Sequence, residues 1–169
     1  MTDYDLLTAQ AEALLESESG YLPFLSNLSA LIKDSMEDVN WAGFYLLRGG
    51  FLVVGPFQGH PACIRIEIGK GVCGTAVKEM RSILVKDVHA FPGHIACDAA
   101  SASEIVVPLQ DADGKIRGVL DIDSPLKARF TETDQEGLEK LCGRLSGKIC
   151  WEASGPDLFP ERRLSPGTL

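Results

Sequence analysis

The sequence is short of positive charge. Its 169 residues include 16 lysines and arginines against 24 aspartates and glutamates, which gives a formal net charge of -8 at pH 7. Most of such a surface would repel phosphate backbones and anionic lipid headgroups. The composition therefore argues against nucleic acid and membrane surfaces as partners.

A long apolar run and a basic N-terminal segment are also missing. No stretch of the chain approaches the ~18 consecutive apolar residues of a membrane span. Residues 1–7 carry Asp3 and Asp5 instead of the basic region of a secretory signal. We therefore expect neither export nor membrane insertion, and we expect a cytoplasmic location.

The sequence lacks the signatures of a disordered chain and of a disulfide framework. Hydrophobic residues make up 45% and charged residues 24%, as in globular proteins. The five cysteines are odd in number and form no C-x-x-C pair, which indicates thiols that are kept reduced or used chemically. We expect one domain over residues 1–169, with a helix at 3–18, a core at about 22–152 and a poorly ordered, Pro-containing tail at 153–169.

Hydrophobic periodicity predicts helices at both ends of the chain and strands between them. The helical patterns cover 3–18, 21–36, 75–81 and 131–151, and the strand patterns cover 41–47, 51–54, 64–68, 82–87, 105–109 and 116–122. Gly-rich turns join two pairs of these strands into hairpins, so we predict an α+β domain with a central antiparallel sheet flanked by N-terminal and C-terminal helices. Residues 89–103 form a long loop, and loops of this length are usually functional.

Three cysteines lie in turns or loops and are candidates for thiol chemistry: Cys63, Cys73 and Cys97. Cys73 precedes a predicted helix, whose free N–H groups and dipole would lower its pKa, and this favours Cys73 as an attacking thiol. Cys142 and Cys150 fall in the predicted closing helix, where we expect core packing or inert thiols. A reduction that oxidises one thiol needs a second thiol to resolve the product as a disulfide.

Carboxylates alternate along the last predicted strand. The period of two puts Arg117, Val119, Asp121 and Asp123 on one face and Ile116, Gly118, Leu120 and Ile122 on the other. The two aspartates would stand roughly 6–7 Å apart, so burial would raise the pKa of at least one and leave it a proton to donate. Glu104, at the start of the neighbouring strand, can join them.

Two further patterns have rival interpretations. Gly69–Gly74 matches G-x-G-x-x-G, but further βαβ units are missing, so we favour a turn whose N–H groups hold a substrate carboxylate over a nucleotide site. His60 with Cys63, and His94 with Cys97, form two H-x-x-C pairs that could hold zinc. Zinc there would quench the thiols that a redox enzyme needs, and we expect no metal and no organic cofactor.

Four segments resemble the free methionine-R-sulfoxide reductases, a GAF-fold family: Asn40–Tyr45, Gly55–Cys63, Gly69–Gly74 and Leu120–Pro125. The resemblance covers about residues 22–150 and includes Cys63, Cys73 and Cys97 in the family's relative placement. It implies a thioredoxin-recycled oxidoreductase that acts on the free amino acid, with a role in the response to oxidative stress.

The resemblance also implies residue roles. Cys97 would attack the sulfoxide sulfur, with Cys73 or Cys63 as the resolving thiol, although the helix argument favours Cys73 as the nucleophile. Glu104, Asp121 and Asp123 would hold the ammonium group and the oxygen, and Trp41, with Tyr45 less strongly implied, would line the pocket for the S-methyl group. Trp41 and Tyr45 are four residues apart on one predicted strand and therefore share a face.

The alternative from another class is a GAF module that binds a small molecule without catalysis. Such modules usually feed an output domain, for which this chain has no room, and three loop cysteines favour an enzyme. The amphipathic first helix could also pack against a second copy, so a homodimer remains open.

Overall fold

A computed structural model describes residues 2–93, 95 and 99–152 of the 169-residue chain. Two helices open the fold, α1 (Tyr4–Ser17) and α2 (Tyr21–Ser35). The carboxylate of Asp3 accepts a hydrogen bond from the N–H of Leu6 and caps α1, because the first N–H groups of a helix have no partner within it. Both predicted N-terminal helices are confirmed to within one residue at each end.

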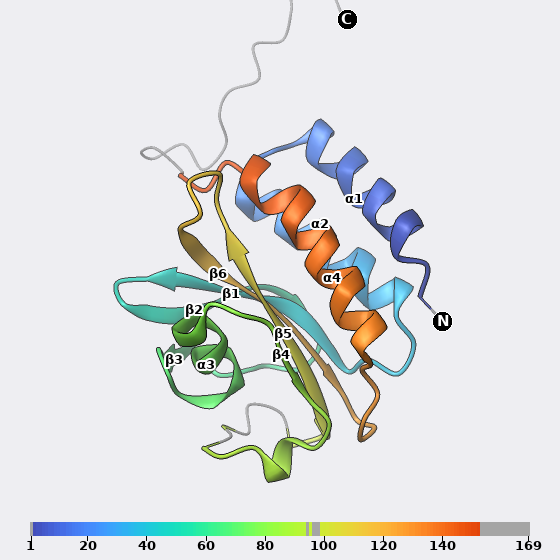
Figure 1. The fold of residues 1–169 in the computed structure, drawn as a ribbon. Coiled ribbons are helices and arrows are strands. Elements are labelled where there is room, and N and C mark those ends of the chain that lie inside the picture. The colour runs from blue at the N-terminus through green and yellow to red at the C-terminus, as the bar shows by residue number, and fades with distance from the viewer. Residues whose placement is uncertain (1, 94, 96–98, 153–169) are drawn as a thin grey trace, which may run out of the picture.

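The centre of the fold is one six-stranded sheet in the order β3-β2-β1-β6-β5-β4 (Figure 1). Each pair of neighbouring strands is antiparallel, which confirms the predicted α+β fold with a central antiparallel sheet. The strands are β1 (Trp41–Arg48), β2 (Phe51–Gln58), β3 (Arg65–Glu67), β4 (Ile83–Val85), β5 (Ser103–Gln110) and β6 (Ile116–Ser124). Strand β2 continues from the predicted end at Val54 to Gln58, because it stays paired to β1 as far as Ala42.

The two remaining α-helices differ from their predicted bounds. Helix α3 (Gly71–Glu79) begins four residues earlier than predicted, so Cys73 lies inside its first turn. Helix α4 (Glu132–Leu145) begins with a capping box of Thr131 and Asp134. It ends six residues earlier than predicted, and a 3-10 turn (Ser146–Lys148) follows. A second 3-10 turn spans Val88–Ala90. Within the described ranges, no helix is both long and apolar enough to cross a membrane.

The end of the domain is tied to its beginning by the backbone of Cys150. Its carbonyl oxygen accepts from the N–H of Tyr21, and its N–H donates to the carbonyl oxygen of Ser19. Cys150 is therefore an exposed residue of a short bridge. Its predicted place in the closing helix is wrong. Gly147 weakens the helix there, and the backbone groups of Cys150 are hydrogen-bonded to Ser19 and Tyr21 instead of to the helix.

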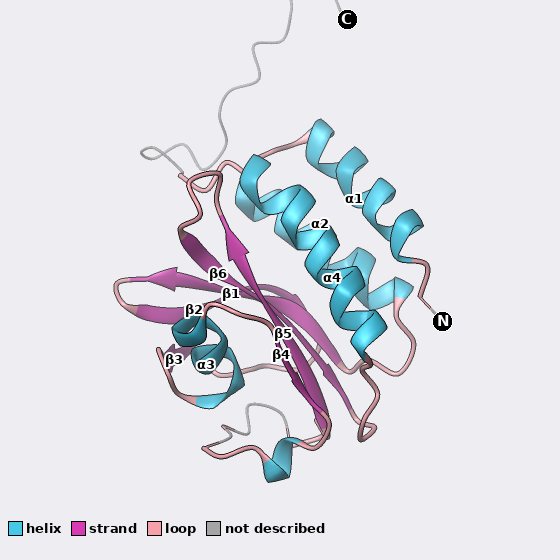
Figure 2. Cartoon of the chain, in the orientation of Figure 1, coloured by secondary structure: helices cyan, strands magenta, loops and turns pink. Residues whose placement is uncertain are grey.

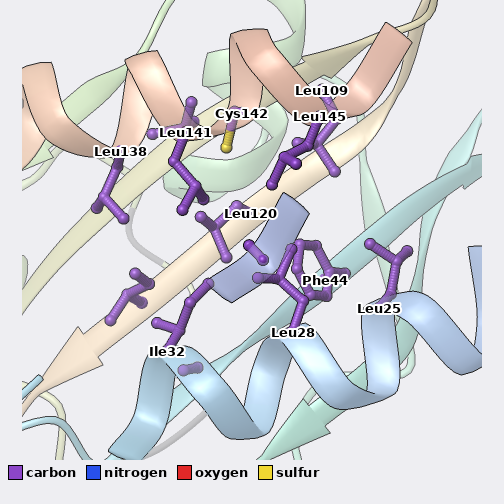
Figure 3. Packing of buried hydrophobic residues seen from close by; sticks show 14 of the residues in the cluster. Leu25, Leu28, Ile32, Phe44, Leu109, Leu120, Leu138, Leu141, Cys142 and Leu145 are labelled. Atoms are coloured by element: carbon purple, nitrogen blue, oxygen red, sulfur yellow. The ribbon is translucent and has the colours of Figure 1, made fainter. Parts of the chain in front are cut away.

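The sheet separates two apolar clusters. Helices α1, α2 and α4 cover one face, and α3 lies on the other (Figures 1 and 2). On the three-helix side, Leu25, Leu28 and Ile32 of α2 and the buried face of α4 pack against Phe44, Leu109 and Leu120 of the sheet (Figure 3). The cluster on the α3 side includes Trp41, Tyr45, Leu52, Ile66, Val72, Cys73, Val85, Val106 and Val119. This second side contains the candidate chemistry.

Candidate active site

The register of the sheet brings the candidate acids together. Glu104 of β5 lies opposite Asp123 of β6, and Asp123 lies opposite Trp41 of β1. Asp121 is two residues along β6 from Asp123, so it shares its face, and its partner on β1 is Gly43. Three carboxylates from two strands thus meet beside one tryptophan, in the row of residues that faces α3.

The predicted alternation along β6 is confirmed over most of the strand. Val119 belongs to the cluster on the α3 side, whereas Leu120 and Ile122 belong to the three-helix side. Ile116 is the exception, because it packs on the α3 side. The pairing with β5 shifts by one residue at this end of β6, and such a bulge reverses the face that a side chain takes.

Cys73 completes a compact buried group with two of the acids. Cys73, Glu104 and Asp121 are only 4%, 7% and 6% exposed. The thiol of Cys73 lies 3.9 Å from Oε1 of Glu104. One ligand-type atom from each of the three residues lies within 4.8 Å of the other two. Asp123 is half-buried at the edge of this group.

Burial shifts the protonation of both buried acids in the same direction. Loss of solvent raises the pKa of Asp121 to about 7. The pKa of Glu104 lies well above its usual range because of burial and the nearby Asp121 and Asp123 charges. Near neutral pH the pair therefore holds at least one proton, which is the state expected of a general acid.

The expected low pKa of the Cys73 thiol is wrong. Cys73 does lie in the first turn of α3, but burial and the charges of Asp121 and Glu104 raise its pKa well above the usual value. Desolvation and two acidic neighbours outweigh the partial positive charge of a helix end, whose effect falls off within one turn. Cys73 is therefore a protonated thiol at neutral pH and a poor nucleophile.

Two backbone N–H groups of the turn before α3 are already hydrogen-bonded within the protein. The N–H of Gly69 donates to the carbonyl oxygen of Gly74, and the N–H of Lys70 donates to that of Glu67. Any carboxylate bound here would therefore meet the N–H groups at the start of α3 instead of those of the preceding turn.

Trp41 and Tyr45 share the α3-side face as predicted, and both hold the segment that carries Cys63. Their rings stack with centroids 5.9 Å apart. The indole N–H of Trp41 donates to the carbonyl oxygen of His60 at 3.1 Å, and the hydroxyl of Tyr45 donates to that of Cys63 at 3.0 Å. The ring of Phe57 also stacks on Trp41, with the two centroids 5.1 Å apart. Phe57 was not predicted as a site residue, because the strand pattern in the sequence ends at Val54.

Substitution of Tyr45 by phenylalanine is expected to lower the free energy of unfolding by about 1–3 kcal/mol, because it leaves the Cys63 carbonyl without its donor. Urea unfolding of the oxidised protein measures this. Tyr21→Phe is the matched control, because the half-buried Tyr21 ring contacts the Arg48 guanidinium. An equal loss in both variants would contradict the role assigned to the Tyr45 hydroxyl.

The four cysteines among the described residues fall into three groups. Cys63 is disulfide-bonded. Cys73 and Cys142 are buried free thiols, and Cys150 is an exposed one. Cys142 packs in the cluster on the three-helix side, and burial raises its pKa to about 12, as suits an inert core residue. Cys97 and His94 lie outside the described residues, and with Cys63 in a disulfide its sulfur is not free to bind zinc in the H-x-x-C arrangement.

Known proteins of two kinds resemble this chain. Residues 4–149 match the GAF domain family. A free methionine-R-sulfoxide reductase from Escherichia coli is 52% identical over 142 residues, which cover 84% of this chain and 86% of the relative. The free methionine-R-sulfoxide reductase of Saccharomyces cerevisiae is 46% identical over 82% of this chain and 81% of its own length.

Solved structures agree in fold. The structure described as fRMsr of Staphylococcus aureus in complex with substrate is 54% identical, with a TM-score of 0.83 over 88% of this chain and 97% of that one. A protein from Burkholderia vietnamiensis described as a putative GAF sensor is 55% identical, with a TM-score of 0.83 over 86% and 92%. These two relatives carry different functional descriptions at the same level of similarity.

Proposed function

The chain belongs to the GAF-domain family of free methionine-R-sulfoxide reductases, and we propose that it reduces free methionine-R-sulfoxide to methionine by thiol chemistry. The observation that carries this proposal is the buried pair of Glu104 and Asp121, which keeps a proton near neutral pH. A sulfoxide oxygen must be protonated or strongly hydrogen-bonded while a thiolate attacks the sulfur. A sensor of a neutral ligand has no such need.

The first step joins the nucleophilic thiol to the sulfoxide sulfur. We assign this role to Cys97, as the resemblance to the reductase family implies, because burial raises the pKa of Cys73 and leaves its thiol protonated. The oxygen passes to the cysteine sulfur, so methionine leaves and Cys97 becomes a sulfenic acid. Asp121 or Glu104 supplies the proton to the oxygen as the sulfur–oxygen bond of the substrate breaks.

Cys63 suits the resolving role better than Cys73. Its thiol would attack the Cys97 sulfenic acid and release water, which leaves a disulfide between the two residues. Cys63 is disulfide-bonded here, whereas Cys73 is a free buried thiol. A thioredoxin dithiol would then reduce the disulfide and become oxidised in turn, which returns both cysteines to thiols.

The remaining site residues would bind the free amino acid. The carboxylates of Asp123 and of whichever buried acid is ionised can pair with the substrate ammonium, a group that a residue within a peptide chain does not have. Trp41 and Tyr45 would give the S-methyl group an apolar wall. Their hydrogen bonds to the 60–63 backbone would also hold Cys63 in place. A homodimer stays part of this proposal, but the apolar face of α1 packs on α2 and α4 of its own chain.

The similarity to a putative GAF sensor favours one rival, a module that binds a small molecule without turning it over. Under this alternative the acids would recognise a cationic ligand and the cysteines would have no catalytic part. Methionine release decides between the two proposals.

The test supplies free methionine-R-sulfoxide, the free S epimer and a peptide-bound sulfoxide separately, with thioredoxin, its reductase and NADPH. We expect methionine only from the free R epimer and none from Cys97→Ser, with Cys150→Ser as a thiol control that keeps wild-type turnover. No turnover of any sulfoxide by the wild-type protein would instead support the binding module.

A further inference from the structure

Cys73, Glu104 and Asp121 form a buried set of metal-ligand groups on three different elements. Helix α3 supplies the sulfur, and strands β5 and β6 supply the carboxylates. One atom from each lies within 4.8 Å of the other two, and all three residues are buried. Because the sheet register and the packing of α3 fix these groups, their convergence does not depend on an exposed loop.

A second observation shows that this group is incompletely satisfied. Oδ1 of Asp121 is buried and has no hydrogen-bond partner among the described residues. Buried polar atoms are almost always paired, and leaving one unpaired costs free energy. A cation or a donor group placed between the three side chains would remove this cost.

The donor types determine which cation fits. A thiolate with carboxylates suits Zn²⁺ or its softer relative Cd²⁺, whereas Mg²⁺ and Ca²⁺ take oxygen ligands alone. In a tetrahedral zinc site, bonds of about 2.3 Å to sulfur and 2.0 Å to oxygen place these ligand atoms about 3.5 Å apart. The observed 3.9 Å between Sγ of Cys73 and Oε1 of Glu104 would need only a small contraction.

We infer that Cys73, Glu104 and Asp121 bind one thiophilic divalent cation, Zn²⁺ or Cd²⁺, in the place of the substrate. Three protein ligands leave a fourth position for water, as in open zinc sites. The bound ion would displace the proton from the carboxylates and prevent them from pairing with the substrate ammonium. The reductase would therefore be inhibited. The binding stands by itself, and only the inhibition rests on the proposed function.

Cadmium binding to the oxidised full-length protein tests the site without any turnover, since Cys63 is then in its disulfide. Equilibrium dialysis counts the ions, and thiolate-to-metal absorption reports a sulfur ligand. Cys150→Ser removes the exposed thiol and should still bind one ion with this absorption. Cys73→Ser should lose the absorption and bind at least about tenfold more weakly. Absorption that survives in Cys73→Ser, or no binding by the wild-type protein, would overturn the site.

A second variant, in which a carboxylate ligand is replaced, tests the site even if the Cys73→Ser protein does not fold. Asp121→Asn keeps the thiol and the side-chain size, and it should also weaken Cd²⁺ binding by about tenfold or more. Asp111→Asn, in the turn before β6, should leave binding unchanged. Equal affinity in Asp121→Asn and the wild-type protein would rule out Asp121 as a ligand. If the dialysis succeeds but no sulfoxide is turned over, the metal site stands and the reductase proposal fails.

Discussion

Replacing Asp121 with asparagine is expected to lower kcat/KM for free methionine-R-sulfoxide by about 10²–10⁴-fold while making the protein more stable. The amide has nearly the same size and can donate a hydrogen bond, but it cannot give a proton to the departing oxygen. Steady-state turnover and thermal unfolding, both measured at several pH values, check the two halves of this prediction.

The stability gain follows from the raised pKa of Asp121. Burial moves it from 3.8 to about 7, so between these pH values the folded state binds more protons than the unfolded state. The stability of the wild-type protein must therefore fall as pH rises through this window. The asparagine side chain of the variant does not titrate, so the advantage of the variant should grow to a few kcal/mol by pH 7, with about 2–4 °C in Tm for each kcal/mol.

Asp111→Asn is the matched control because its effect has the opposite sign. Hydrogen bonds from the Lys115 backbone and the Arg117 side chain hold the pKa of Asp111 below its usual range. That stability is present above the unfolded pKa and is lost as pH falls, so the variant should have a lower Tm at neutral pH and wild-type turnover. Melting temperatures that shift in the same direction in both variants would contradict the assignment of Asp121 as a buried, proton-holding acid.

Gly43→Ala is expected to destabilise the protein by about 2–3 kcal/mol and to raise KM. A Cβ at Gly43 would come within 2.7 Å of Cα of Phe57 and 2.8 Å of Cη2 of Trp41, and it would also overlap Cβ of Phe57. Backbone atoms of β2 cannot move away without disturbing the pairing with β1. Because Gly43 is the register partner of Asp121, the displaced rings would also disturb the acid site.

Gly143→Ala makes the same chemical change where there is space. Nothing lies within 4 Å of a Cβ built at this exposed position of α4. Alanine should stabilise the helix by about 0.5–1 kcal/mol and leave KM unchanged. Urea unfolding and substrate titration of both variants measure the contrast. A Gly43→Ala protein as stable as the wild type would contradict this prediction, because it would show that the backbone of β2 can move to make room for the new Cβ.

Hydrophobic periodicity predicted most of the fold, because helices and strands depend mainly on interactions between residues that are close in the sequence. Alternation along β6 assigned Asp121 and Leu120 to opposite faces, since a strand repeats every two residues. The start of the predicted helix at Thr131 is likewise close to the observed one, because its capping box joins residues only three apart. The reversal at Ile116 escaped prediction because a bulge depends on the partner strand.

The protonation of the site could not be predicted in the same way. The sequence indicated a helix end near Cys73, but the burial that raises its pKa comes from β5 and β6, which lie far along the chain. Phe57 stacks on Trp41 because β2 continues beyond Val54, where the predicted strand ends. In each case a contact between distant segments outweighed the local preference.

The separation of the two apolar clusters by the sheet has a consequence for how such a protein can change. Substitutions under α2 and α4 alter how firmly the sheet is held, while those beneath α3 alter what the acids and thiols meet. During evolution, substitutions on the three-helix side can therefore change thermal stability without changing the chemistry of the acid site. A directed-evolution library confined to the three-helix side should therefore change stability while sparing the chemistry of the acid site.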